Sequence, residues 1–215
     1  MATTSSTEQR LLINGEWRGA ASGATFTRAD PYTGERASEA SAAGREDARA
    51  AVESAHAAFA QWSQSAPAER RAVLSRAAEL IGERQDEIAQ TMIEETGATF
   101  GWGMFNCMLA AGMLREAAAQ TYGTIGEVIP SDIPGKLAMA VRSPAGVVIG
   151  IAPWNAPVIL AARAVAMPLA YGNTVVLKAS ELCPRTHAHI AAAIADGSMF
   201  NVSSCTSTKT GFAPR

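Results

Sequence analysis

The clearest pattern of apolar and polar residues lies in the second half of the chain. Residues 147–151 are an apolar run rich in β-branched side chains that ends before Pro153, which predicts a fully buried strand. Residues 158–169 have the composition of a helix, and Gly172 lies where a left-handed helix end is expected. Residues 174–178 repeat the apolar strand pattern. The order strand, helix, strand predicts a right-handed βαβ unit in an α/β fold.

Two amphipathic stretches precede this unit. Apolar residues recur in them at three- and four-residue steps, which is typical of helices with one buried face. The second stretch begins at Pro67, a residue suited to a first helical turn, and its pattern continues to Gly97. The predicted buried residues are Ala48, Val52, Ala55, Phe59 and Trp62 in the first stretch, and Val73, Leu74, Ala77, Leu80, Ile81, Ile88, Met92 and Ile93 in the second.

Residues 100–122 carry methionine and aromatic side chains at helical spacing. Such residues form protein cores more often than ligand pockets, so a core role is favoured here over a pocket. The residues concerned are Trp102, Phe105, Met108, Leu109, Met113 and Leu114.

Two further segments have the pattern of paired strands. Asn14 and Gly15 stand between apolar residues, a combination that predicts a tight β-hairpin. Within residues 126–144, Leu137, Met139 and Val141 alternate with smaller or polar residues. An isolated two-stranded hairpin is marginally stable, so we expect a partner to cover this second one.

Composition narrows the function classes. The chain has 215 residues and a net charge of −2, which gives no electrostatic reason to expect nucleic acid or an anionic membrane as a partner. Residues 1–10 are polar, so no secretory signal is expected, and no membrane span is expected either. Three irregularly spaced cysteines favour reduced thiols in a cytoplasmic protein, and no metal-binding or GxGxxG pattern is present.

Two motifs place this sequence beside a known family. They are Ala152-Pro153-Trp154-Asn155-Ala156-Pro157 and Gly172-Asn173-Thr174-Val175-Val176-Leu177-Lys178-Ala179-Ser180-Glu181. In this order and at this separation they resemble the aldehyde dehydrogenase superfamily. Residues 105–184 more narrowly resemble the branch that oxidises aromatic aldehydes such as salicylaldehyde, benzaldehyde and vanillin. The resemblance covers roughly residues 10–195, the front part of a family chain more than twice as long.

The resemblance implies a truncated α/β fold, the N-terminal portion of the family's Rossmann-like parallel sheet with flanking helices. It divides the chain into four segments. Residues 1–125 would be the hairpin and helices that open the nucleotide-binding domain, and 126–144 a projecting bridging hairpin for oligomerisation. Residues 145–195 would be the βαβ part of the NAD-binding domain. Residues 196–215 match no family unit and are expected to be irregular.

The resemblance also implies the site residues. Asn155 would stabilise the oxyanion that forms on the aldehyde, although spacing alone favours an asparagine that merely holds the turn. Lys178 and Glu181 would hold the ribose hydroxyls of the nucleotide, whereas the alternative from the residues alone is a surface ion pair, which is common and contributes little to stability. Because Glu181 would repel a 2′-phosphate, NAD is expected over NADP. The other expected cofactor-binding residues are Ile151, Ala152, Pro153, Trp154 and Ser180.

A substrate pocket for an aldehyde is expected beside Asn155. Ile159 and Arg163 follow Asn155 at four-residue steps and are predicted to share its helix face. We expect Ala156 to leave room for the substrate, and Arg163 to bind a polar ring substituent. The family's helix that matches residues 100–122 borders the aldehyde tunnel, so Trp102 and Phe105 are expected to line it.

The family's nucleophilic cysteine and its glutamate base lie beyond the matched segment. Cys107 and Cys183 are expected to be structural, and Cys205 lacks the motif of the nucleophile. The first hypothesis is therefore part of an NAD-dependent aldehyde dehydrogenase, inactive alone and forming dimers or tetramers in its full-length form. The alternatives are a non-catalytic short form that binds nucleotide or associates with intact subunits, and a misfolding remnant.

Overall fold

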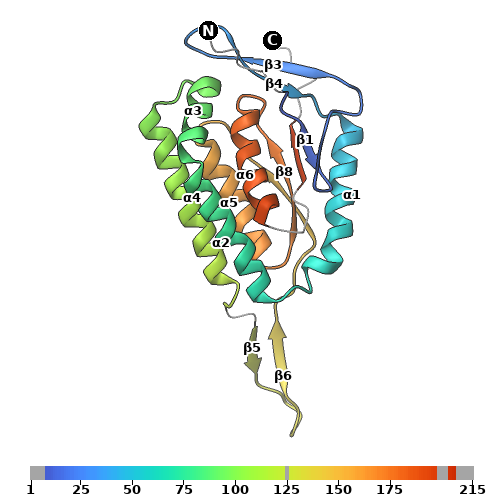
Figure 1. The fold of residues 1–215 in the computed structure, drawn as a ribbon. Coiled ribbons are helices and arrows are strands. Elements are labelled where there is room, and N and C mark those ends of the chain that lie inside the picture. The colour runs from blue at the N-terminus through green and yellow to red at the C-terminus, as the bar shows by residue number, and fades with distance from the viewer. Residues whose placement is uncertain (1–7, 124–125, 198–202, 207–215) are drawn as a thin grey trace, which may run out of the picture.

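The computed structural model describes residues 8–123, 126–197 and 203–206 (Figure 1). Within these residues the main sheet has five strands. The sheet order is β2-β1-β9-β8-β7. Two smaller two-stranded sheets pair β3 with β4 and β5 with β6. The strands are β1 (Leu11–Ile13), β2 (Glu16–Arg18), β3 (Thr25–Ala29), β4 (Arg36–Ser41), β5 (Gly126–Ile129), β6 (Ala138–Val141), β7 (Val147–Ile151), β8 (Thr174–Ala179) and β9 (Ser203–Thr206).

Helices cover both faces of the main sheet (Figure 1). On one face, α1 (Arg45–Trp62) packs on β7, β8 and β9. On the other face, α5 (Pro157–Ala170) packs on β7 and β8, and α6 (Pro184–Gly197) packs on β8 and β9. The remaining helices, α2 (Pro67–Glu83), α3 (Gln85–Thr96) and α4 (Phe100–Gln120), pack outside α5 and α6. Successive side chains of β8 point to opposite faces of the sheet. Val176 packs in the cluster under α1, while Val175 and Leu177 pack in the larger core on the other face.

The predicted βαβ unit is confirmed. Strands β7 and β8 are parallel, α5 connects them, and Gly172 adopts a φ of 79° after the helix end. The prediction that β7 is fully buried is wrong, since Ile149 and Ile151 are 60% and 72% exposed. The reason is the position of the strand: β7 lies at one edge of the described sheet, whereas β8 has a neighbouring strand on each side.

The buried face of α1 is shifted from the predicted one. Ala55 and Trp62 are buried as expected, but Ala48 and Val52 are exposed and Phe59 is half-buried. Ala51 packs against the sheet instead of Val52. Small side chains let this helix lie close to the sheet, so alanine rather than the larger valine is buried at the contact. In α2 and α3 the predicted buried residues are confirmed, except that Ile93 is half-buried.

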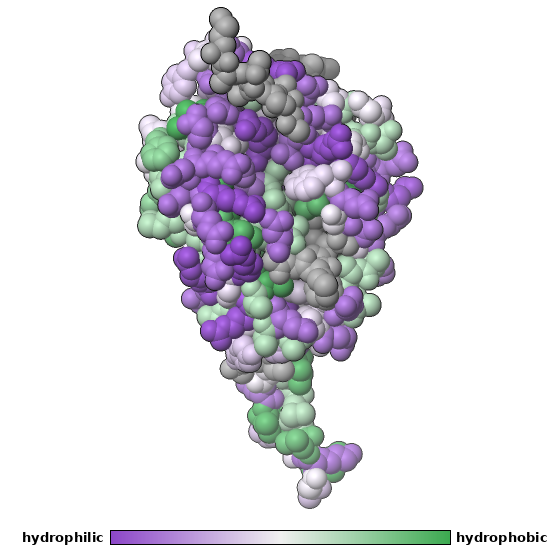
Figure 2. Space-filling view, in the orientation of Figure 1, coloured by the Kyte–Doolittle hydropathy of each residue, from purple (hydrophilic) through white to green (hydrophobic). Residues whose placement is uncertain are grey.

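The two predicted hairpins are both present. Asn14 and Gly15 have positive φ angles of 57° and 75°, the conformation that the turn between β1 and β2 requires. The β5–β6 hairpin projects from the body, and Figure 2 shows apolar surface along it. Its exposed apolar residues are Val128, Ile129, Ile133, Leu137, Met139 and Val141.

The predicted irregular tail contains a strand. Within residues 196–215, the structure describes the end of α6 and strand β9, which pairs parallel to β8 and antiparallel to β1. The sequence signal was absent because Ser203–Thr206 has no hydrophobic alternation. Pairing with two neighbouring strands, rather than side-chain pattern, places this segment in the sheet. Residues 198–202 and 207–215 lie outside the described residues.

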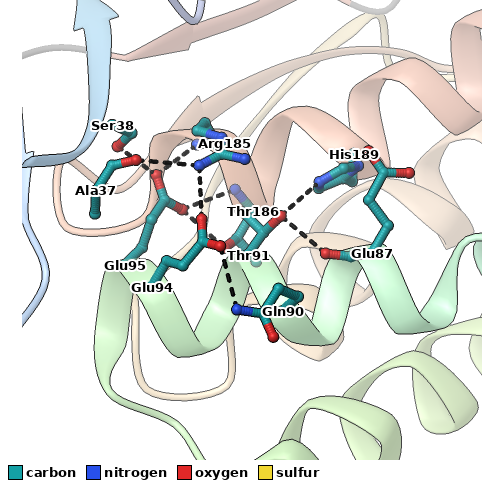
Figure 3. Close-up of polar contacts among 10 residues, drawn as sticks. All are labelled: Ala37, Ser38, Glu87, Gln90, Thr91, Glu94, Glu95, Arg185, Thr186 and His189. Atoms are coloured by element: carbon teal, nitrogen blue, oxygen red, sulfur yellow. Dashed lines mark hydrogen bonds and ion pairs between the residues drawn. The ribbon is translucent and has the colours of Figure 1, made fainter. Parts of the chain in front are cut away.

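A buried carboxylate ties three elements together (Figure 3). Glu95, near the end of α3, is fully buried and accepts four hydrogen bonds. Its Oε1 accepts from the Ser38 hydroxyl at 2.8 Å and from the Arg185 N–H at 3.0 Å. Its Oε2 accepts from the N–H and hydroxyl of Thr186 at 2.9 and 2.8 Å. Burial raises the pKa of the Glu95 carboxyl, and these hydrogen bonds oppose the rise.

Glu95 therefore fixes the start of α6 against α3 and β4. We predict that Glu95→Gln lowers the free energy of unfolding by about 3 kcal/mol, because the amide would turn an N–H toward buried donors. Urea unfolding followed by circular dichroism measures the change. Glu94→Gln is the matched control, since half-buried Glu94 contacts Arg185 at 3.0 Å and its loss should cost less than about 1 kcal/mol. Equal stabilities of the two variants would contradict this role of Glu95.

Candidate active site

The loops that follow β7 and β8 begin side by side. The two strands are parallel and in register, with Ile151 opposite Lys178 at their ends. The Ala152 N–H extends the pairing by donating to the Lys178 carbonyl at 3.2 Å. Ligands of open α/β sheets bind at this carboxyl edge of the strands. The predicted site residues of both motifs are therefore brought together at one edge of the sheet.

Asn155 is exposed in the turn between β7 and α5. Its backbone carbonyl accepts a hydrogen bond from the Trp102 indole N–H at 3.3 Å, which fixes the turn to α4. Among the described residues, no hydrogen bond to the Asn155 side-chain amide is found. The turn is held by backbone and by Trp102, and the amide N–H groups of Asn155 are left to face solvent or a ligand.

The loop after β8 carries an ion pair. Lys178 Nζ lies 3.2 Å from Glu181 Oε2, and each side chain is 32% exposed. Ser180 is buried, and its hydroxyl accepts from the Leu182 N–H at 3.2 Å, which shapes the loop locally. Ammonium and carboxylate thus remain partly accessible on the loop that follows β8. Of the remaining predicted cofactor residues, Ala152 is buried while Ile151, Pro153 and Trp154 are exposed.

The N-terminus of α6 is already occupied. The backbone N–H groups of Arg185 and Thr186, which could otherwise bind an anion, donate to Glu95. Phosphate groups of a nucleotide would therefore find no free donors at this helix end.

The apolar residues of α4 divide between core and surface. Cys107, Ala110, Ala111 and Leu114 are buried, so the core prediction is confirmed for Leu114. It is wrong for Trp102 and Phe105, which are 41% and 42% exposed, and for Met108 and Leu109, which are also exposed. The Trp102 and Phe105 rings stack with their centroids 5.5 Å apart. An apolar surface therefore adjoins the Asn155 turn.

The shared helix face predicted for Asn155, Ile159 and Arg163 is not observed. Asn155 lies before the helix, whose N-cap is Ala156, so helical spacing does not apply to it. Ile159 is buried and its N–H donates to the Asn106 side chain at 3.4 Å, whereas Arg163 is exposed.

The two described cysteine side chains are poor nucleophiles. Both are buried. Burial raises the pKa of Cys107 to about 11 and that of Cys183 further, so neither forms a thiolate readily at neutral pH. This agrees with the structural role predicted for them. The side chain of Cys205 lies outside the described residues.

Two other kinds of site are absent from the ranges that the structure describes. They contain no group of three or more histidine, cysteine or acidic side chains arranged to hold a metal ion. None of the helices described is both long enough and apolar enough to cross a bilayer.

Comparison with known proteins agrees with this geometry. The model of the aldehyde dehydrogenase family matches residues 17–202. The chain belongs to the aldehyde dehydrogenase family. It is 57% identical over 189 residues to a vanillin dehydrogenase of Pseudomonas sp. (strain HR199 / DSM 7063), an alignment covering 88% of this chain and 39% of that relative.

Solved structures of aldehyde dehydrogenases share the fold. A salicylaldehyde dehydrogenase from Pseudomonas putida G7, complexed with salicylaldehyde, superposes with a TM-score of 0.91 at 35% identity, covering 94% of this chain and 42% of that one. A NAD-dependent benzaldehyde dehydrogenase from Corynebacterium glutamicum gives 0.88 at 33% identity, covering 93% and 44%. The chain thus spans about two fifths of the length of the relatives that it matches.

One buried residue was missed by the sequence analysis. His187 lies in the first turns of α6, is fully buried, and accepts a hydrogen bond from the Ser180 N–H on Nδ1 at 2.9 Å. A single histidine near a helix start gives no recognisable signal, because the contact partners lie in loops whose arrangement depends on the sheet.

Proposed function

We propose that this chain supplies the oxyanion donor and the nucleotide-binding loop of an NAD-dependent aldehyde dehydrogenase acting on aromatic aldehydes. The observation that supports it most is the exposed Asn155 amide beside the accessible Lys178–Glu181 pair, at adjoining ends of parallel strands. The vanillin and salicylaldehyde relatives support the substrate class.

Asn155 suits the role of oxyanion stabiliser. Its amide donates a hydrogen bond without itself titrating, so its donor strength is constant across physiological pH. The turn that carries it is held by the Trp102 indole, which reduces the reorganisation needed when charge develops on the aldehyde oxygen. Asn155 would therefore stabilise the transition state by a preorganised dipole.

The Lys178–Glu181 pair fits a ribose of the nucleotide. A hydroxyl both donates and accepts, so a neighbouring ammonium and carboxylate satisfy a vicinal pair of hydroxyls. Glu181 would repel a ribose 2′-phosphate, which favours NAD, although the solved relatives include an E. coli NADP dependent enzyme as well as NAD-dependent ones. NAD, when bound, supplies the acceptor for the hydride that leaves the aldehyde.

The apolar surface beside Asn155 suits an aromatic aldehyde. The stacked rings of Trp102 and Phe105 offer flat contact area next to the turn, and Ala156 leaves room for close approach. The exposed Arg163 guanidinium would bind a ring hydroxyl or another polar substituent. Ile159 would act from the core side, supporting the turn rather than touching substrate.

By itself the chain of 215 residues is proposed to bind nucleotide and to oxidise no aldehyde. Both described thiols are buried, which makes them unsuited to attack an aldehyde. The second candidate function is association with other subunits through the β5–β6 hairpin, whose apolar side chains are exposed.

The first prediction concerns the nucleotide. We expect the chain to bind NAD at least about tenfold more tightly than NADP, and Glu181→Gln to remove most of that difference by removing like-charge repulsion. Tryptophan fluorescence titration measures both dissociation constants, with Trp154 as the nearby reporter. Glu116→Gln, an exposed glutamate on α4, is the control and should leave them unchanged. Tighter NADP binding by the unmodified chain would refute the preference.

The second prediction concerns catalysis, in a chimera of residues 1–195 with the C-terminal part of the Pseudomonas vanillin dehydrogenase. Asn155→Ala should lower kcat about 100- to 1,000-fold, the usual cost of one oxyanion donor, while the affinity for NAD is unchanged. The Arg163→Leu chimera should oxidise vanillin and unsubstituted benzaldehyde with similar kcat/KM. Steady-state kinetics decides both. Full activity of the Asn155→Ala chimera would exclude the proposed role.

The third prediction concerns assembly. We expect the chain to self-associate through the hairpin, because a second copy would cover its apolar side chains. Leu137→Asp combined with Met139→Lys should shift the sedimentation coefficient to that of a monomer. Val52→Asp, at an exposed apolar position on α1, is the control and should not. Unchanged sedimentation of the hairpin variant would place the interface elsewhere.

A further inference from the structure

Helix α5 begins without a cap from its own sequence. Its N-cap residue is Ala156, whose methyl group accepts no hydrogen bond, and Pro157 at the first helical position has no N–H. The first intrahelical hydrogen bond runs from the Leu160 N–H to the Ala156 carbonyl at 2.9 Å. The N–H of Ile159, at the third helical position, therefore needs an acceptor from another part of the chain.

Asn106 of α4 supplies that acceptor. Its Oδ1 accepts from the Ile159 N–H at 3.4 Å, and its Nδ2 donates to the Trp102 carbonyl, one helical turn earlier, at 3.0 Å. The partners fix the orientation of this amide, because the Ile159 N–H can only donate and the Trp102 carbonyl can only accept. Asn106 is completely buried with both ends of its side chain paired, and it caps α5 from a neighbouring helix.

The same turn of α4 also holds Asn155. The Trp102 indole N–H donates to the Asn155 carbonyl at 3.3 Å. Trp102 is itself fixed at the start of α4, where its backbone N–H donates to the Thr99 hydroxyl at 3.2 Å. Two side chains four residues apart on α4 thus bind the backbone at residues 155 and 159. The oxyanion turn and the first turn of α5 are held together as one unit.

Close packing fixes this part of α4 from behind. Gly103 lies against α3, where an added Cβ would stand 2.7 Å from the Cβ and 2.8 Å from the Cα of Ala89. Contacts that short leave no space between the two helices at this point. Trp102 and Asn106, on either side of Gly103 in sequence, therefore have a firm base from which to hold the turn.

We infer that Asn106 is a positioning residue, which caps α5 from α4 and so fixes the Asn155 amide beside the Trp102 ring. This inference rests on the proposed function, which makes Asn155 the oxyanion donor. Because the cap comes from α4, position 156 needs no serine or aspartate and can remain alanine on the aldehyde side of the turn. The donor is preorganised by a side chain that touches neither aldehyde nor nucleotide.

Substitutions at Asn106 separate the cap from the other contact. Asn106→Leu removes both hydrogen bonds and leaves the buried Ile159 N–H without an acceptor. Asn106→Asp keeps an acceptor oxygen at a helix N-terminus, where negative charge is favourable. Asn106→Ser can bond the Trp102 carbonyl but is too short to reach Ile159. Thr91→Val is the matched control, because Thr91 is a buried side chain of α3 that donates to the Glu87 carbonyl at 2.9 Å.

Amide hydrogen exchange of the 215-residue chain, followed by nuclear magnetic resonance, tests the cap. The readout is the exchange rate of the Ile159 amide relative to that of Ala166 in the same helix, so a change in overall stability cancels. In Asn106→Leu we expect this ratio to rise about tenfold, the factor for one lost hydrogen bond. Asn106→Asp and Thr91→Val should stay within about twofold of the unmodified chain.

An unchanged ratio in Asn106→Leu would overturn the inference. Asn106→Ser provides the same test if the Leu variant does not fold, because it also loses the contact with Ile159. A tenfold rise in Thr91→Val would equally overturn the inference, since the effect would then follow from any lost buried hydrogen bond.

Kinetics of the chimera test whether Asn106 acts through Asn155. Asn106→Leu should lower kcat for vanillin about tenfold and leave the KM for NAD unchanged, whereas Thr91→Val should change neither. In the Asn155→Ala background, Asn106→Leu should cause no further loss, because the group that it positions is gone. A further tenfold loss there would overturn the positioning role.

The two proposals fail in different ways. Full activity of the Asn155→Ala chimera would contradict the proposed function, whatever the exchange experiment shows. The exchange ratio of Ile159 to Ala166 would still decide whether Asn106 caps α5.

Discussion

Parallel, in-register pairing of β7 with β8 is the constraint on which the rest of the structure depends. Because Ile151 faces Lys178, the two strands end together and their loops begin at the same edge of the sheet. Residues that are distant in sequence, such as Asn155 and Glu181, thereby become parts of one surface. The helices do not create this surface. They secure it, α4 through the Trp102 indole and α6 through the His187 imidazole.

Close packing of small residues makes this arrangement rigid. A Cβ added at Gly150 would lie 2.9 Å from the Cβ of Ala164, so α5 lies almost directly on β7. Alanines on α1, α4 and α5 likewise fill the core between larger side chains such as Trp62 and Leu114. Such contacts leave little room for one layer to slide over another. The strand ends, where the loops of the site begin, are therefore held in place relative to the helices.

Local features of the fold could be predicted from the sequence. Three of them depend on the conformational preference of one or two residues: the Asn14-Gly15 turn, the start of α2 at Pro67, and the left-handed Gly172 that follows α5. Position in the sheet could not be predicted in this way. The exposure of Ile149, and the pairing of Ser203–Thr206 with β8, both depend on which strands are neighbours.

The same distinction applies to the candidate site. The motifs brought Asn155, Lys178 and Glu181 to attention, and the structure places them at one edge. The helical spacing of Asn155 and Arg163 was misleading because the helix begins two residues after Asn155. His187 gave no pattern at all, since its hydrogen bond with the Ser180 N–H depends on the conformation of the loop between β8 and α6.

The place of β9 has a consequence for how this chain folds. β9 lies between β1 and β8, so one of the last described segments separates the first strand from the βαβ unit. During synthesis, β1 and β2 leave the ribosome long before β9 exists. The N-terminal hairpin must wait for residues 203–206 before the sheet becomes continuous, and contacts of such long sequence separation form slowly. Until then, the hairpin and the βαβ unit each present an unpaired strand edge.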